Sequence, residues 1–234
     1  KKIIVTGSRG LIGAELCRFF KKKFRLLELD LVLGHDLTDE KFVRKWFKEN
    51  HADYLVNCFA LNDHVDKKKR GNTLYNISLE SFSDYLQVNL TALFSVCREF
   101  SRNNKKGSIV NFSSTYGLVS PKPDIYRGLH KHAAYGVSKA GVINLTQYLA
   151  THLAPNVRIN CVVPGGILFN QNKKFRQSRY YHHMIFSGSP TYKERIKATN
   201  SHICRGVSSF DHPTMFVPAR PLAMVLYTIL SVGL

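Results

Sequence analysis

Two residues with complementary acid–base chemistry stand four positions apart in the segment Tyr135-Gly-Val-Ser-Lys139. In a helix these two side chains share one face, so the lysine ammonium favours the ionised form of the tyrosine hydroxyl. A free tyrosine titrates near pH ~10, and a lower pKa would let it exchange protons nearer neutral pH. The same pair also occurs on many solvated helices, so the elements around it decide its interpretation.

A glycine-rich loop at the start of the chain predicts a nucleotide-binding turn. The run Ile3-Ile4-Val5 is followed by Thr6-Gly-Ser-Arg-Gly-Leu-Ile-Gly13 and by a helical pattern over residues 14–20. In such strand–turn–helix units the first glycine permits a tight turn, the second lets the backbone approach a pyrophosphate, and the third lets the helix pack on the strand. A purely structural turn is the alternative. The predicted cofactor-binding residues of the loop are Gly7, Arg9, Gly10, Leu11, Ile12 and Gly13.

An acidic residue follows the second predicted strand. This strand covers residues 24–29 and ends at Asp30, where a carboxylate can accept hydrogen bonds from the adenosine ribose. The position favours NAD, but Arg9 in the glycine loop could bind the 2′-phosphate of NADP, so NADP stays an alternative.

The segments after Asp30 predict a shortened connection between the second and third strands of the sheet. The turn at Asp36-Leu37 follows too soon for a full helix, and a helix over 41–49 and a strand over 52–59 come next. The turn from Asn57 to Ala60, which includes Phe59, ends that strand and is expected to face the nicotinamide side of the cofactor.

Taken together, residues 1–167 resemble the short-chain dehydrogenase/reductase family. The motifs that carry the resemblance are the Thr-Gly loop, Asp36-Leu37, Asn57 to Ala60, Asn89 in Val-Asn-Leu-Thr, Ser114, Tyr135 with Lys139, and Pro164-Gly165-Gly166-Ile167. Within the family, Ser-Ser-Thr-Tyr-Gly-Leu-Val-Ser-Pro-Lys-Pro and Pro-Gly-Gly-Ile look like oxidoreductases of bacterial flagellin-glycosylation and nonulosonic-acid sugar loci. The resemblance implies one α/β domain, a doubly wound Rossmann-type parallel sheet with helices on both faces, that binds NAD or NADP through these segments.

The resemblance also implies roles for the site residues. Ser114 would bind the substrate oxygen, and Tyr135 would exchange a proton with it as hydride passes to or from the nicotinamide. Lys139 would lower the Tyr135 pKa and bind the nicotinamide ribose. Asn89 would kink its helix and hold a water that links Lys139 to solvent, or it is a helix-kinking core amide without a proton role. Only one of Ser113 and Ser114 can face the site, because neighbouring strand residues point to opposite faces.

Two departures from the family pattern concern the substrate. The spacing G-x-x-G-x-x-G is typical of sugar-nucleotide epimerases and dehydratases, which are therefore an alternative to a simple sugar reductase. The long basic stretch from Tyr116 to His132 could bind a phosphate or carboxylate of the substrate, or it is a solvated loop. The candidate substrate residues are Thr115, Arg127 and Lys131. We expect a secondary alcohol or ketone as substrate, in a sugar or an anionic sugar derivative.

Composition indicates one ordinary globular domain of 234 residues, of which 44% are hydrophobic. No apolar run has the length of about 20 residues that a membrane span needs, and the start lacks a signal-peptide pattern, so we expect a cytoplasmic protein. Five cysteines without C-x-x-C spacing predict buried free thiols and no metal site; they are Cys17, Cys58, Cys97, Cys161 and Cys204. The family usually forms homodimers or homotetramers.

The net charge of +18 is high, and the last third of the chain is atypical. Lysine clusters follow predicted helix ends, where cations are hydrated, and no nucleic-acid-reading motif accompanies them, so nucleic-acid binding is not expected. Residues 168–234 lack the family's closing acidic-glycine turn and carry nine Lys/Arg against two acidic residues. This tail has either diverged or comes from a shifted reading frame. A defective tail would leave a nucleotide-binding or interaction protein with impaired catalysis.

Overall fold

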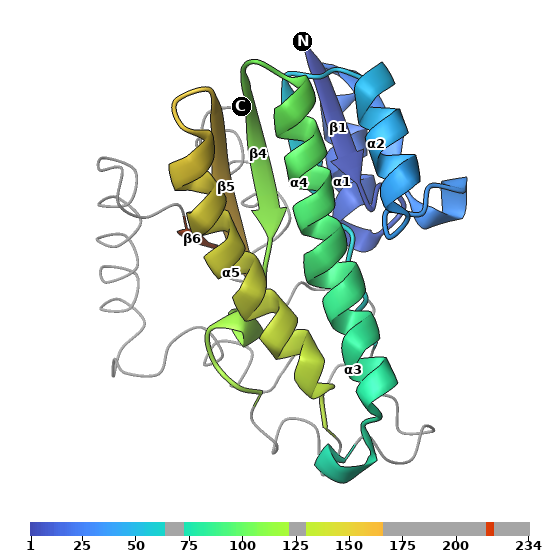
Figure 1. The fold of residues 1–234 in the computed structure, drawn as a ribbon, viewed down its shortest axis with the longest axis vertical. Coiled ribbons are helices and arrows are strands. Elements are labelled where there is room, and N and C mark those ends of the chain that lie inside the picture. The colour runs from blue at the N-terminus through green and yellow to red at the C-terminus, as the bar shows by residue number, and fades with distance from the viewer. Residues whose placement is uncertain (64–72, 122–129, 166–213, 218–234) are drawn as a thin grey trace.

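The computed structural model describes residues 1–63, 73–121, 130–165 and 214–217. Six strands form one sheet in the order β2-β1-β3-β4-β5-β6, and each neighbouring pair is parallel (Figure 1). The direction of the strand order reverses between β1 and β3, and open parallel sheets bind ligands at such a reversal. The strands are β1 Lys2–Thr6, β2 Arg25–Leu29, β3 Tyr54–Asn57, β4 Gly107–Phe112, β5 Val157–Pro164 and β6 Thr214–Val217.

Helices cover both faces of the sheet, as Figure 1 shows. On one face α1 packs through Leu16 and Phe20 on the strand residues Ile3 and Val5. On the other face α2, α4 and α5 share a core with the alternate strand residues, such as Ile4. This arrangement confirms the predicted α/β fold. The helices are α1 Leu11–Phe20, α2 Glu40–Glu49, α3 Leu79–Leu86, α4 Ala92–Asn103 and α5 Ala133–Leu153.

The segment between β2 and α2 is as short as the sequence predicts. A single 3-10 turn, η1 Leu31–Leu33, stands where a full crossover helix would lie. The strand predicted over 52–59 is shorter in the structure, which assigns Tyr54–Asn57 to β3. Residues 58–60 lie outside β3, although Cys58 N–H still donates to the Thr6 carbonyl at 3.0 Å, and the backbone of residues 58 and 59 passes close to Gly7.

A row of buried polar side chains crosses the sheet near the carboxyl ends of its strands. Thr6, Asn57 and Asn111 are register partners on β1, β3 and β4. The Thr6 hydroxyl lies 3.0 Å from Asn57 Oδ1, and Asn57 Nδ2 donates to Asn111 Oδ1 at 2.9 Å. Asn111 Nδ2 then donates to Thr146 Oγ1 on α5 at 3.1 Å. We call these four residues the polar row; each buried amide is paired, as burial requires.

The atypical tail supplies one strand of the sheet. β6 comes from residues 214–217 and pairs with β5 from Cys161 to Pro164. A sixth strand is therefore in place. The division into residues 1–167 and 168–234 stays a prediction, because most of the second segment lies outside the described residues.

Three expectations about thiols, membranes and metals concern the described residues. Cys17, Cys97 and Cys161 are buried free thiols, as predicted; Cys58 is free but only partly buried, and Cys204 lies outside the described part. Within the described ranges, no helix is long and apolar enough to span a bilayer. Nor do three or more metal-binding side chains gather in that part of the chain.

Candidate active site

The glycine loop between β1 and α1 folds tightly against the end of β3. Gly7 has a φ of +63°, and a Cβ there would lie 2.5 Å from the Phe59 nitrogen. A Cβ on Gly13 would lie 2.0 Å from the Gly7 carbonyl oxygen, so α1 starts directly on the loop backbone. Gly10 N–H donates to the Gly7 carbonyl at 3.1 Å. Positions 7 and 13 therefore require glycine for steric reasons.

Asp30 closes the loop from the side of β2. Its Oδ2 accepts a hydrogen bond from the Arg9 backbone N–H at 2.8 Å, and its Oδ1 accepts one from Val32 N–H at 3.0 Å. The Arg9 guanidinium lies 3.4 Å from a carboxylate oxygen of Glu28. A 2′-phosphate would have to compete with this ion pair for Arg9.

The loop also contains an unsatisfied polar group. Among the described residues, only Ser8 and Ser95 have a buried side-chain hydroxyl without a hydrogen-bond partner. The Ser8 residue is 1% exposed and stands between Gly7 and Gly10. Because a buried hydroxyl normally has a partner, this one fits a loop that binds an oxygen-rich ligand. The residues present therefore suit the pyrophosphate of a dinucleotide.

The other predicted cofactor-binding residues lie in a turn, in the core, in the polar row and at the end of β5. The Asp36 carboxylate accepts from Thr38 N–H at 2.8 Å, and Leu37 belongs to the core. The Asn57 side chain lies in the polar row, so any cofactor contact of the 57–60 turn must come from the backbone or from its neighbours. Pro164 ends β5 and Gly165 follows it, whereas Gly166 and Ile167 lie outside the described residues.

The two serines at the end of β4 separate as the pleat predicts. Ser113 is buried and its hydroxyl donates to the Lys139 carbonyl at 2.6 Å, so it joins β4 to α5. Ser114 caps the next turn, η4 Thr115–Gly117, where its Oγ accepts from Tyr116 N–H at 3.2 Å. That hydroxyl still carries a hydrogen with which it can donate.

Turn η4 packs on the first turns of α5 because two glycines allow it. A Cβ on Gly117 would lie 2.6 Å from the Lys139 carbonyl carbon, and one on Gly136 would lie 2.9 Å from the Tyr116 oxygen. The Tyr116 and Tyr135 rings meet edge to face, with centroids 6.5 Å apart. These contacts fix η4, which Ser114 caps, against the turns of α5 that carry Tyr135 and Lys139.

Lys139 is a buried cation next to this tyrosine. Its Nζ donates to the Phe112 carbonyl at 2.9 Å and lies 5.9 Å from the centre of the Tyr135 ring. Burial lowers the pKa of Lys139 to about 8, although the nearby Cys161 and Cys58 thiols oppose this shift. The ammonium is therefore charged at neutral pH, and its field acts on the Tyr135 hydroxyl.

Asn89 lies in a π-helical segment, η3 Gln87–Thr91, between α3 and α4. Its Oδ1 accepts from Leu61 N–H at 2.6 Å, and its Nδ2 donates to the Leu61 carbonyl and to the Ser138 hydroxyl. The side chain thus ties the loop after β3 to α5. This pattern supports the helix-distorting amide, and the water link to Lys139 stays a prediction.

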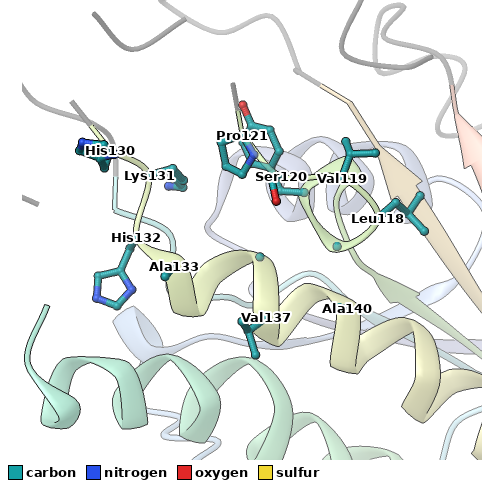
Figure 2. Close-up of a pocket in the computed structure, with 13 residues that line it drawn as sticks. Leu118, Val119, Ser120, Pro121, His130, Lys131, His132, Ala133, Val137 and Ala140 are labelled. Carbon is teal, nitrogen blue, oxygen red and sulfur yellow. The ribbon is translucent and has the colours of Figure 1, made fainter. Parts of the chain in front are cut away.

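A cavity of about 500 Å³ lies beside the start of α5 (Figure 2). Its walls come from residues 116–121 and 130–133 and from the exposed side of α5 at Val137 and Ala140. Of the predicted substrate residues, Lys131 lines it, Thr115 is buried at the start of η4 and does not line it, and Arg127 lies outside the described residues. Ser114, Tyr135 and Lys139 are not in its lining, so the cavity adjoins the candidate catalytic residues without containing them.

Sequence reasoning missed several residues that support the site. His132 caps α5, lies 3.1 Å from the Ser81 hydroxyl and stacks on the Tyr85 ring at 4.3 Å. Burial lowers the pKa of His132, so it is neutral near pH 7. Ser138 receives the Asn89 amide. A polar residue three positions after Tyr135 was the signal available for Ser138, whereas nothing local marks Tyr85 as a partner of His132.

Comparison with known proteins agrees with this geometry. A family model described as enoyl-(acyl carrier protein) reductase matches residues 18–202. The chain is 24% identical to a short-chain dehydrogenase from Leptospira borgpetersenii serovar Hardjo-bovis, crystallised with bound NAD+. Their TM-score is 0.67 over 94% of this chain and 91% of the other, which shows a common fold. The chain belongs to the short-chain dehydrogenase/reductase family.

Two curated relatives carry more specific names. The chain is 37% identical over 124 residues to "Probable galactose dehydrogenase GalD" of Rhizobium meliloti, a match that covers 51% of this chain and 43% of the relative. It is 31% identical over 174 residues to post-translational flagellin modification protein A of Campylobacter coli, covering 70% of this chain and 65% of the relative. Each match thus spans less than two thirds of the relative's length.

Proposed function

We propose that this protein is an NAD-dependent oxidoreductase that interconverts a secondary alcohol and a ketone, in a sugar or sugar derivative. The observation that supports the proposal is the packing of η4, which Ser114 caps, on the first turns of α5, which carry Tyr135 and Lys139. In the proposed site, Ser114 is the hydrogen-bond donor, Tyr135 the proton-exchanging phenol and Lys139 the cation, and the glycine loop binds the nucleotide.

Each side chain of the proposed site has a separate role in hydride transfer. When bound, the nicotinamide cofactor supplies or accepts the hydride. Ser114 donates a hydrogen bond to the substrate oxygen, which holds the reacting carbon in place. Tyr135 gives a proton to that oxygen in reduction and takes it back in oxidation. Lys139, charged below a pKa of about 8, keeps the ionised state of Tyr135 accessible.

The contacts of Asp30 and Arg9 favour NAD over NADP. Asp30 stands at the end of β2, where a carboxylate accepts hydrogen bonds from ribose hydroxyls and repels a 2′-phosphate. Arg9, the one cation of the glycine loop, is already paired with Glu28. The bound NAD+ of the Leptospira structure supports this preference.

A sugar substrate is supported by the name of one relative, "Probable galactose dehydrogenase GalD". An anionic group on the sugar stays a prediction that concerns Arg127 and Lys131. Replacing both residues with alanine is expected to raise KM for an anionic sugar, and an unchanged KM would remove this part of the proposal. A homodimer or homotetramer is the expected assembly, which gel filtration tests.

The decisive experiment is a titration of the purified protein with NADH and NADPH, in which fluorescence reports cofactor binding. We expect saturable NADH binding in the micromolar range, weaker NADPH binding, and little change in Tyr135→Phe, whose turnover with a sugar substrate should nevertheless fall by about 100-fold or more. Tyr148→Phe is the matched control, because Tyr148 is exposed on the distal part of α5. No NADH binding by the folded protein would overturn the proposal in favour of an interaction protein.

A further inference from the structure

Lys131, just before α5, lies over the ring of Tyr135. Its Nζ is 4.6 Å from the ring centre, closer than the 5.9 Å that separates Lys139 Nζ from the same point. Two ammonium groups thus lie within electrostatic reach of one phenol. A cation near a phenol favours the ionised form, because the charge interacts more strongly with phenolate than with the neutral ring.

The position of Lys131 is fixed by contacts from a distant part of the chain. Its Nζ donates to Asn62 Oδ1 at 2.5 Å and to the Asp63 backbone carbonyl. Asp63 N–H in turn donates to the Tyr85 hydroxyl at 3.1 Å, and the Tyr85 ring meets the Tyr135 ring edge to face. A solvated lysine has no such partners. These contacts hold the Lys131 side chain over Tyr135.

We propose that Lys131 is a positioning residue that acts through Tyr135: held by Asn62 and Asp63, its ammonium favours the ionised tyrosine hydroxyl alongside Lys139. The chemical significance of this effect rests on the proposed function, in which Tyr135 exchanges the proton. The electrostatic effect itself requires neither cofactor nor substrate.

The charge of Lys131 depends on pH in the range where the site would work. Burial lowers the pKa of Lys131 to about 8, and the Asp63 carboxylate opposes the shift. Below that pH the Lys131 ammonium stabilises the phenolate of Tyr135. Above that pH Lys131 becomes neutral and this stabilisation is lost, unless the negative charge of the phenolate keeps Lys131 protonated. The two groups therefore titrate as a coupled pair. The other titratable groups around them are Asp63, Tyr85, Tyr116, His130, His132 and Lys139.

This role differs measurably from binding an anionic substrate. Lys131 also lines the cavity of Figure 2, so its ammonium could contact a phosphate or carboxylate there. Loss of a substrate contact raises KM and leaves the ionisation of Tyr135 unchanged. Loss of a tuning charge moves the ionisation of Tyr135 and with it the acidic limb of the kcat/KM profile.

The test is an ultraviolet absorbance titration of tyrosinate without ligands. Subtracting the curve of a Tyr135→Phe partner from that of each variant isolates Tyr135. For charges about 5 Å apart at the edge of a protein, removing one is expected to raise the Tyr135 midpoint by about one pH unit in Lys131→Met. Lys131→Arg carries a cation throughout the titration and should not raise the midpoint. Lys45→Met, on the exposed side of α2, is the control and should also keep it.

An unchanged midpoint in a folded Lys131→Met protein would overturn the proposal. If that variant does not fold, Asn62→Ala removes one anchor of the ammonium and should raise the midpoint by a smaller amount; no rise there would overturn it equally. Because these titrations use the ligand-free protein, they stay valid if NADH binding fails. Where turnover is measurable, the acidic limb of kcat/KM should shift with the midpoint at constant NADH affinity.

Discussion

Replacing Gly13 with alanine tests the contact on which the glycine loop depends. The new Cβ would lie 2.0 Å from the Gly7 carbonyl oxygen, 2.8 Å from the Gly7 carbonyl carbon and 3.0 Å from Ser8 Cα. Non-bonded heavy atoms in good contact stand about 3.5 Å apart, so the start of α1 would have to retreat by more than about 1 Å. All three are backbone atoms, which cannot rotate away as a side chain would.

The expected cost follows from two opposing effects. Alanine favours the helical state over glycine by up to about 1 kcal/mol. Forcing an extra methyl group into a packed site costs about 1–3 kcal/mol, and more where backbone must move. We expect a net loss of about 2–3 kcal/mol in the free energy of unfolding, which for a domain of this size lowers Tm by roughly 4–12 °C.

Thermal unfolding followed by circular dichroism measures this loss, with two other glycines as controls. A Cβ on Gly34 would meet nothing within 4 Å, but the residue has a φ of +82°, so Gly34→Ala carries only backbone strain of about 1 kcal/mol. A Cβ on Gly10 would lie 3.3 Å from the Gly7 oxygen, which a small shift relieves. A Tm for Gly13→Ala equal to that of the unchanged protein would show that α1 does not start on the loop backbone.

Three further outcomes are expected. The pKa of Lys139 falls on folding from 10.5 to about 8, so the unfolded chain binds more protons than the folded one between these pH values. The urea concentration at the midpoint of unfolding should therefore rise from pH 8 to 9. Above pH 9 it should fall, because burial raises the pKa of the Cys97 and Cys161 thiols from 9.0 to about 12. Asn89→Ala leaves Leu61 N–H without its side-chain acceptor and should cost about 2 kcal/mol in chemical denaturation. Asp30→Ala removes the carboxylate that would repel a 2′-phosphate, and the ratio of the NADPH to the NADH Kd should fall by about 10-fold or more in fluorescence titrations.

Local features of the sequence predicted those parts of the fold that local geometry dictates. The glycine loop was recognisable because Gly7 needs a positive φ and Gly13 a missing Cβ, and both demands come from residues within the same turn or nearby backbone. The four-residue spacing of Tyr135 and Lys139 placed them on one face of α5 for the same reason. Strand alternation predicted that Ser113 and Ser114 point to different sides, and they have different partners, whereas the role of Ser114 came from the family resemblance and stays a prediction.

The support of the site was not predictable in this way. Lys131 meets Asp63, which is 68 positions away, and no periodicity links the two. The sequence presented Lys131 as one of several cations in a basic loop, and only the fold distinguishes it by placing it over Tyr135. β6 is similar: a four-residue strand without a motif is defined by its partner β5 rather than by its own residues.

The polar row has a consequence for how the sheet assembles. If β3 slipped by one residue against β1 and β4, Val56 or Cys58 would stand where Asn57 stands, and the Thr6 hydroxyl and the Asn111 amide would lose their cross-strand partner. Buried polar groups without partners cost about 1–3 kcal/mol each, so misaligned sheets would be short-lived during folding. The polar row thus favours the native register of β1, β3 and β4, and it aligns the ends of these strands at the edge from which the glycine loop and η4 emerge.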